Sequence, residues 1–294
     1  MKEVVVLSGK GGTGKTSIVG SFASIAQSKV LADCDVDAAD LHLLLQPTLR
    51  EEQEFWSGQM AAIDKQRCTE CALCQDLCRF KAIEDYIVNP VSCEGCGFCY
   101  RICPAEAITM TENLAGRWSI SDTRYGPLVH ARLGIAQENS GKLVALVRQQ
   151  AKRIAEKDDA RYIISDGPPG IGCPVISSLS GASLALLVTE PTLSGIHDLE
   201  RILGVCHHFG VKALVCINKC DINEENSRQI EGYCLLKGVA VAARIPFDNV
   251  VTEAMVHGQT VVEYARNGVS HQIEALWDSV LKSLNELGRD SGDN

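Results

Sequence analysis

The chain has 294 residues, of which 46% are hydrophobic and 22% charged, and a formal net charge of −9. These values are ordinary for a globular protein of about two domains, and the acidic balance argues against a nucleic-acid-binding surface. The sequence has neither an apolar run of about 18 residues nor a secretory signal after Met1. We therefore expect a cytoplasmic protein without a nucleic-acid partner or a membrane anchor.

A glycine-rich loop follows the first predicted strand, Val4-Val5-Val6-Leu7, and precedes a helix-compatible segment, 17–28. Its spacing, G-x-x-x-x-G-K-T, lets backbone N–H groups surround a phosphate at the positive end of a helix dipole. In such a loop Lys15 reaches the β- and γ-phosphates and Thr16 ligates Mg²⁺. The predicted nucleotide-binding residues here are Gly9, Lys10, Gly11, Gly12, Thr13, Gly14, Lys15 and Thr16.

A second lysine, Lys10, lies directly after Gly9 in this loop. The segment K-G-G-T-G-K-T resembles the deviant Walker A box of the MinD/ParA/Mrp and nitrogenase-iron-protein superfamily. The resemblance implies a slow, partner-stimulated ATPase that pairs with a second copy or a related ATPase when ATP binds. In that family the early lysine reaches the nucleotide of the facing subunit, so Lys10 joins Lys15 as a catalytic candidate. The alternative is a solvated lysine at a loop tip.

Acidic residues follow the second predicted strand, 30–32. At the carboxyl end of a strand beside a phosphate loop, such residues lie where Mg²⁺ and an attacking water are expected. The segment resembles the switch I of the same family. By that resemblance Asp35 positions or activates the water and Asp40 holds a Mg²⁺-bound water, unless Asp40 simply caps the next helix. Asp33 and Asp37 receive no role.

Fourteen cysteines in a chain without an export signal are better explained by metal or cluster ligation than by disulfides. Eight of them form two C-x₂-C-x₂-C-x₃-C runs, the ligand pattern of a bacterial two-cluster ferredoxin, in which the fourth cysteine of each run ligates the other cluster. Structural zinc is the competing explanation, although a zinc site needs only four ligands. The predicted ligands are Cys68, Cys71, Cys74 and Cys103 for one [4Fe–4S] cluster, and Cys78, Cys93, Cys96 and Cys99 for the other.

A buried-strand pattern, 162–164, leads to a motif that resembles an Mrp-type switch II, with the residues Asp166, Gly167, Pro168, Pro169 and Gly170. We expect Asp166 to accept from Thr16 or from a Mg²⁺-bound water, as a catalytic and magnesium-site residue, and the N–H of Gly170 to sense the γ-phosphate. Cys173 follows, and because no second cysteine matches it, we expect a small buried thiol.

The base-binding side is predicted from the strand 212–217, which delivers Asn218, Lys219, Cys220 and Asp221. Alone, N-K-x-D is the guanine-reading box of GTPases. In the superfamily that this chain resembles, the asparagine at this strand end instead meets adenine, and Pro246 and Phe247 are similar to the loop that covers it. The resemblance favours ATP, whereas Asp221 keeps GTP open.

Repeated strand–helix units predict an α/β fold: a doubly wound, mostly parallel P-loop NTPase sheet, residues 1–60 and 113–294, with an inserted bacterial-type ferredoxin (α+β) domain, residues 61–112. Three functions follow. The first is an ATP-driven dimeric switch that controls electron transfer through the insert, or delivery of its clusters, toward a redox or iron–sulfur client. The second is a positioning ATPase with a redox-sensing insert. The third is a cluster carrier that does not hydrolyse ATP.

Overall fold

The computed structural model describes residues 1–135, 137–266 and 268–290. Contacts between residues divide the chain into two compact units. Unit 1 comprises Met1–Glu52, Ser119–Ala131 and Gly141–Asn294, and unit 2 comprises Gln53–Trp118 and Arg132–Ser140. The insert predicted at 61–112 lies within the range of unit 2, which also takes in parts of the long strands on either side and residues 132–140.

Nine strands of the described chain form one sheet in the order β11-β10-β9-β1-β8-β2-β7-β6-β3. Adjacent pairs from β11 to β7 are parallel. The strands are β1 (Lys2–Ser8), β2 (Lys29–Asp33), β3 (Thr48–Ile63), β6 (Ile108–Thr123), β7 (Gly126–Leu133), β8 (Tyr162–Pro169), β9 (Leu184–Thr189), β10 (Ala213–Asn218) and β11 (Ala240–Ile245). The predicted α/β fold with a mostly parallel sheet is confirmed.

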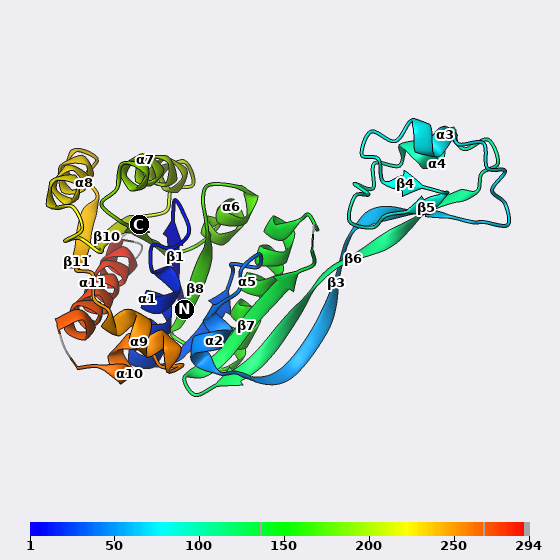
Figure 1. Ribbon diagram of the computed structural model, residues 1–294. Helices are drawn as coiled ribbons and strands as arrows, with labels where there is room; N and C mark the ends of the chain where they lie inside the picture. Colours follow the sequence, from blue (N-terminus) through cyan, green and yellow to red (C-terminus); the bar gives the residue numbers. More distant parts are fainter. Residues whose placement is uncertain (136, 267, 291–294) are drawn as a thin grey trace. The chain divides into compact units, whose positions relative to one another are not determined.

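The helices of unit 1 are visible around the sheet in Figure 1. They are α1 (Lys15–Ile25), α2 (Leu41–Leu45), α5 (Ser140–Lys157), α6 (Cys173–Leu179), α7 (Leu193–His208), α8 (Glu224–Leu236), α9 (Val250–Val256), α10 (Val261–Tyr264) and α11 (Gly268–Asp290). Alternate side chains of β1 divide the core in two. Val4 and Val6 pack with α1 and α11, whereas Val5 and Leu7 pack with α6, α7 and α8. Helices therefore cover both faces, as a doubly wound sheet requires.

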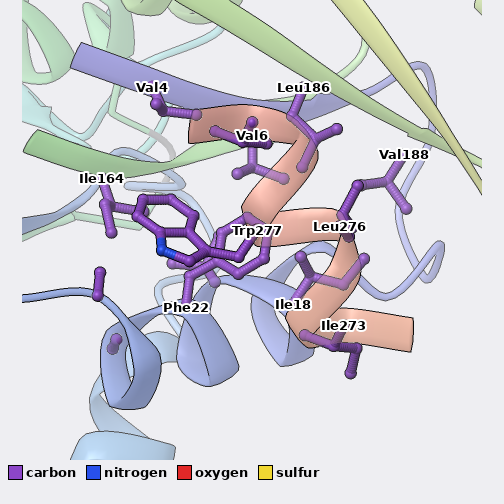
Figure 2. Close-up of a cluster of buried hydrophobic side chains, with 14 of the residues drawn as sticks. Val4, Val6, Ile18, Phe22, Ile164, Leu186, Val188, Ile273, Leu276 and Trp277 are labelled. Carbon is purple, nitrogen blue, oxygen red and sulfur yellow. The ribbon is translucent and has the colours of Figure 1, made fainter. Parts of the chain in front are cut away.

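An aromatic pair closes the first of these clusters (Figure 2). The rings of Phe22 on α1 and Trp277 on α11 have centroids 4.9 Å apart and tilted by 50°. Phe22 is fully buried and Trp277 is 3% exposed. Tilted aromatic pairs add to the stability that comes from area burial. The pair joins the phosphate-loop helix to the last described helix, so α11 is part of the core that positions the loop.

Unit 2 contains two short helices, α3 (Leu73–Asp76) and α4 (Phe98–Ile102), and an antiparallel pair, β4 (Ile83–Glu84) and β5 (Ile87–Val88). Each helix begins after a left-handed residue at the equivalent place in its cysteine run, Ala72 with φ 62° or Gly97 with φ 71°. The repeat in the sequence is therefore also a repeat in backbone conformation.

Of the helices described, none combines the length and the apolar character that a membrane crossing requires.

Candidate functional site

The glycine-rich loop connects β1 to α1. Gly14 has φ 94° and occupies the N-cap of α1, and a Cβ there would lie 2.4 Å from Nδ2 of Asn218. At Gly9 a Cβ would lie 2.2 Å from Cβ of Asp198. Both positions exclude a side chain, so the backbone of the loop stays open to a ligand while it packs closely on its neighbours.

Lys15 is only 6% exposed, and its Nζ donates to Oγ of Ser8 at 2.9 Å. Ser8 in turn donates to the carbonyl of Lys10 at 2.5 Å. Ser8 was not predicted, because a serine at a strand end has no sequence signal of its own. It holds the lysine at the base of the loop.

Two carboxylates lie side by side behind the loop, because Asp33 on β2 pairs in register with Asp166 on β8. Asp33 is fully buried and Asp166 is 1% exposed. Burial raises the pKa of Asp166 to about 7, against the lowering effects of the Lys15 charge and a hydrogen bond from Thr16. Within the described residues, Oδ1 of Asp166 is buried without a hydrogen-bond partner. A buried, unpartnered carboxylate oxygen beside a threonine hydroxyl fits the donor set that Mg²⁺ prefers.

Asp33, which received no role from the sequence, shapes the switch I segment. Its two oxygens accept from the backbone N–H groups of Asp35 and Leu41, each at 3.2 Å. The intervening loop carries Asp35 and Asp40 and is closed over Asp33. Asp40 stands at the N-cap position of α2 but makes no side-chain cap hydrogen bond. The structure therefore does not support the alternative in which the Asp40 side chain caps α2.

The loop, switch I and the base-side residues surround one cavity of about 700 Å³, a volume typical of ligand pockets. Lys219, which had no predicted role, is also in its lining. Predicted residues absent from that lining are Gly9, Lys10, Thr13, Asp166, Gly167, Gly170 and Asp221. Predicted residues that line the cavity are Gly11, Gly12, Gly14, Lys15, Thr16, Asp35, Asp40, Pro168, Pro169, Asn218, Pro246 and Phe247.

The Asp221 side chain accepts a backbone hydrogen bond beside the cavity. Its Oδ1 accepts from the N–H of Phe247 at 2.6 Å, while Nδ2 of Asn218 donates to the carbonyl of Thr13 at 2.7 Å. A guanine-reading aspartate must turn its carboxylate toward the base. In this structure the carboxylate instead fixes the Pro246–Phe247 loop.

The switch II motif begins within a strand and not after it. β8 continues through Pro169, because β1 pairs with it as far as Ser8↔Pro169. The expectation that the strand ends before Asp166 is corrected accordingly. The N–H of Gly170 donates to the carbonyl of Ser8 at 2.9 Å. Cys173, the first residue of α6, is exposed, so the expectation of a buried thiol there is wrong.

The eight cysteines of unit 2 border two cavities, and none of them is in a disulfide. The larger, about 370 Å³, is lined by Cys78, Cys93, Cys96 and Cys99, together with Cys74. The smaller, about 20 Å³, is lined by Cys68, Cys71, Cys74 and Cys103. Each cavity is thus bordered by all four thiols of one predicted set, including the cysteine contributed by the other run. The role of these thiols as cluster ligands stays a prediction.

The two exchanged cysteines have the same local geometry. Sγ of Cys78 accepts from the N–H of Ala82 at 3.4 Å, and Sγ of Cys103 accepts from the N–H of Ala107 at 3.3 Å. Amide donors to sulfur are among the groups that tune protein-bound clusters. Within the part of the chain that the structure describes, no group of three or more His, Cys, Asp or Glu side chains is gathered closely enough to hold a single metal ion.

Residues 4–261 match the family described as the CobQ/CobB/MinD/ParA nucleotide binding domain. The chain belongs to this family. It is similar to the uncharacterized protein MJ0578 of Methanocaldococcus jannaschii, with 36% identity over 228 residues that cover 76% of this chain and 80% of the relative. The family is described as a nucleotide binding domain, and the cavity bordered by the glycine-rich loop is the predicted place for the nucleotide.

Two solved structures of this family share the fold at low identity. The septum site-determining protein MinD of Pyrococcus horikoshii, complexed with Mg-ADP, is 18% identical, with a TM-score of 0.56 and coverage of 95% of both chains. MinD in the MinC:MinD cell division complex of Aquifex aeolicus is 16% identical, with a TM-score of 0.59 and coverage of 96% of both chains. These likenesses concern the fold alone.

Proposed function

We propose that the chain is an ATP-hydrolysing dimeric switch whose nucleotide state controls electron transfer through unit 2, or delivery of clusters from it. The observation that carries this proposal is that each of two cavities is bordered by all four thiols of one predicted set, with Cys74 bordering both, in a chain of a nucleotide-binding family. Neither feature alone distinguishes a redox switch from other members of the family.

In unit 1, Lys15 would neutralise the β- and γ-phosphates, and Thr16 with Asp166 would hold Mg²⁺, directly or through water. Support comes from the unpartnered Oδ1 of Asp166 and from the hydrogen bond of Thr16 to that carboxyl. Asp35 and Asp40 both line the cavity of about 700 Å³ that Lys15 and Thr16 also line. Asp35 would orient the attacking water, and Asp40 would hold a Mg²⁺-bound water as the nucleotide state changes.

We propose ATP as the nucleotide, in preference to GTP. The hydrogen bond from Phe247 N–H ties Oδ1 of Asp221 to the Pro246–Phe247 loop, and Asp221 is not in the lining of the cavity, whereas a guanine-reading carboxylate would have to face the base. Asn218, Pro246 and Phe247 line the cavity, and we expect them to meet adenine, Asn218 through the side-chain groups that its bond to the Thr13 carbonyl leaves open.

In unit 2, the two sets of thiols would each hold a [4Fe–4S] cluster, which supplies one-electron transfer when bound. Thiolates are the donors that such clusters take, and the amide donors to Cys78 and Cys103 would remain in place. The chain's own part is to exclude water with apolar walls, among them Ile83 and Met110 at the larger cavity and Ile108 at the smaller. At about 20 Å³ the smaller cavity would have to widen around a cluster.

Coupling between the units would use ATP-dependent pairing, either with a second copy or with a related ATPase, in which Lys10 reaches the facing nucleotide. In chain order, all four passages between the units come after switch I and before switch II. Segments that a γ-phosphate orders therefore flank these connections along the sequence. The partner would be a redox or iron–sulfur client protein.

A positioning ATPase is a second candidate, favoured by the fold shared with MinD of the MinC:MinD complex. In that case unit 2 would only sense the redox state. The experiment that separates the two functions uses anaerobically purified protein whose clusters have been chemically reduced. Electron or cluster transfer to an added acceptor, measured with ATP, ADP and a non-hydrolysable analogue, should depend on the nucleotide. Equal transfer in all three would reject the switch and favour the second candidate.

A further inference from the structure

The side chain of Lys10 is fully engaged within its own copy of the chain. Its Nζ lies 2.5 Å from Oε1 of Glu190, and it donates to Oγ1 of Thr192 at 3.2 Å and to Oγ of Ser194 at 3.1 Å. A protonated lysine has three N–H donors. Three acceptors can therefore use all of them, which leaves none for a phosphate.

The segment that supplies these acceptors is held in place by close packing. Thr192 caps α7 by accepting from the N–H of Gly195 at 3.0 Å. A Cβ at Gly195 would lie only 2.2 Å from the carbonyl oxygen of Glu190, and one at Gly9 only 2.2 Å from Asp198 on α7. The first approach compacts the turn after β9, and the second brings the start of the phosphate loop against α7, so the acceptors of Lys10 are held close to the loop by packing.

Glu190 has a second cationic partner. Its Oε2 lies 3.1 Å from Nζ of Lys219, which also donates to the carbonyl of Gly12 in the phosphate loop at 3.0 Å. Burial alone would raise the pKa of Glu190, but hydrogen bonds from Lys10 and Lys219 outweigh it and lower the pKa. If Lys10 leaves, the carboxylate still has Lys219, so release does not leave an unpaired half-buried charge.

The side chain of Lys10 is more exposed to solvent than that of Glu190, as release of the lysine requires. The Lys10 side chain is 30% exposed, whereas that of Glu190 is 14% exposed. The lysine can swing outward while the glutamate stays in place beside Lys219.

We propose that Glu190 is a positioning residue that holds Lys10 against its own chain until ATP-dependent pairing draws the lysine across to the facing nucleotide. This inference rests on the proposed function, in which Lys10 acts in the dimer. Glu190 thereby sets the nucleotide concentration at which two copies pair. Thr192 and Ser194 add neutral hydrogen bonds to the same held state.

The test compares wild type, Glu190→Gln and Glu200→Gln by sedimentation, over a titration with a non-hydrolysable ATP analogue. Glu200 is an exposed residue of α7, so its variant is a matched loss of one charge. For Glu190→Gln, the analogue concentration at which half of the protein is dimeric should be about fivefold to tenfold lower than for wild type. This is the range expected from the loss of a partly exposed, hydrogen-bonded ion pair. Glu200→Gln should match wild type. In a Lys10→Ala background, Glu190→Gln should leave any residual pairing unchanged, whereas a general disturbance of the fold would lower it.

A second measurement uses the nucleotide-free monomer. Acetic anhydride should modify Lys10 severalfold faster in Glu190→Gln than in wild type or in Glu200→Gln, with peptide mass spectrometry as the readout. If wild type pairs with the analogue but Glu190→Gln pairs no more readily, the holding role is wrong and the proposed function stands. If wild type itself does not pair, the proposed function fails and this inference fails with it.

Discussion

The exchange of one cysteine between the two runs can be tested by counting iron. Cys78 belongs to the first run in sequence but lines the cavity of the second run. With two clusters, the wild-type chain should contain about eight iron atoms. Cys78→Ala removes one of the four thiols predicted for the second-run cluster. Iron should therefore fall to about four atoms per chain, since a cluster that loses a ligand is expected to be lost as a whole.

Double variants show which cluster is lost. Cys71 and Cys96 are matched probes, because both are exposed second cysteines of their runs and each lines only one of the two cavities. Adding Cys96→Ala to Cys78→Ala should leave about four iron atoms, because both residues serve the same cluster. Adding Cys71→Ala instead should leave almost none, because the second cluster is then lost as well.

The assay is iron and acid-labile sulfide per chain, measured on anaerobically purified protein. Far-ultraviolet circular dichroism on each variant serves as the control for folding. The reverse pattern, with Cys71→Ala silent and Cys96→Ala additive in the Cys78→Ala background, would refute the exchange. Stoichiometric zinc without sulfide in wild type would refute the cluster proposal itself.

Three further outcomes are expected. Lys15→Ala should abolish measurable Mg²⁺-ATP binding in a calorimetric titration, because the buried ammonium is the proposed cation for the phosphates, whereas Asp35→Ala should bind ATP and lose phosphate release. Asp221→Ala should weaken ATP binding by about tenfold or less without creating a GTP preference, because it removes one exposed hydrogen bond to Phe247; a stronger loss for GTP than for ATP in parallel titrations would reverse the base assignment. Phe22→Ala should lower the free energy of unfolding by about 3–5 kcal/mol in denaturant titrations, because it empties a fully buried position against Trp277.

Much of the fold was accessible from the sequence, because its signals are local. Apolar runs separated by helical segments predict parallel strands, and the two cysteine runs mark a separate unit by composition alone. Element ends were less accessible. The strand that carries Asp166 was expected to end earlier, but pairing with β2 extends β8 to Asp166 and pairing with β1 extends it to Pro169. A strand's length in the middle of a sheet depends on its neighbours, which no local pattern contains.

The residues of the candidate site also fall into those that the sequence predicts and those that it does not. Residues with a motif, such as Lys15, Thr16 and Asn218, line the cavity of unit 1. Ser8 and Asp33 had no motif, yet one supports Lys15 and the other closes the switch I segment. Their importance comes from register: Asp33 lies beside Asp166 only because β2 pairs with β8 at that residue.

Glu190 illustrates why such residues also matter for regulation. Its neighbours in sequence, a proline and a threonine, suggest no more than a turn before a helix. In the fold, Glu190 forms ion pairs with two lysines that are 209 residues apart in the sequence, Lys10 and Lys219. From the sequence, Lys10 is a phosphate-loop residue with an expected phosphate ligand, whereas Lys219 stands in the base-side motif without a role of its own. Because one carboxylate pairs with both, a change at either lysine alters the charge that the other experiences. In the proposed switch, Glu190 would therefore link nucleotide contact at the loop to pairing between copies.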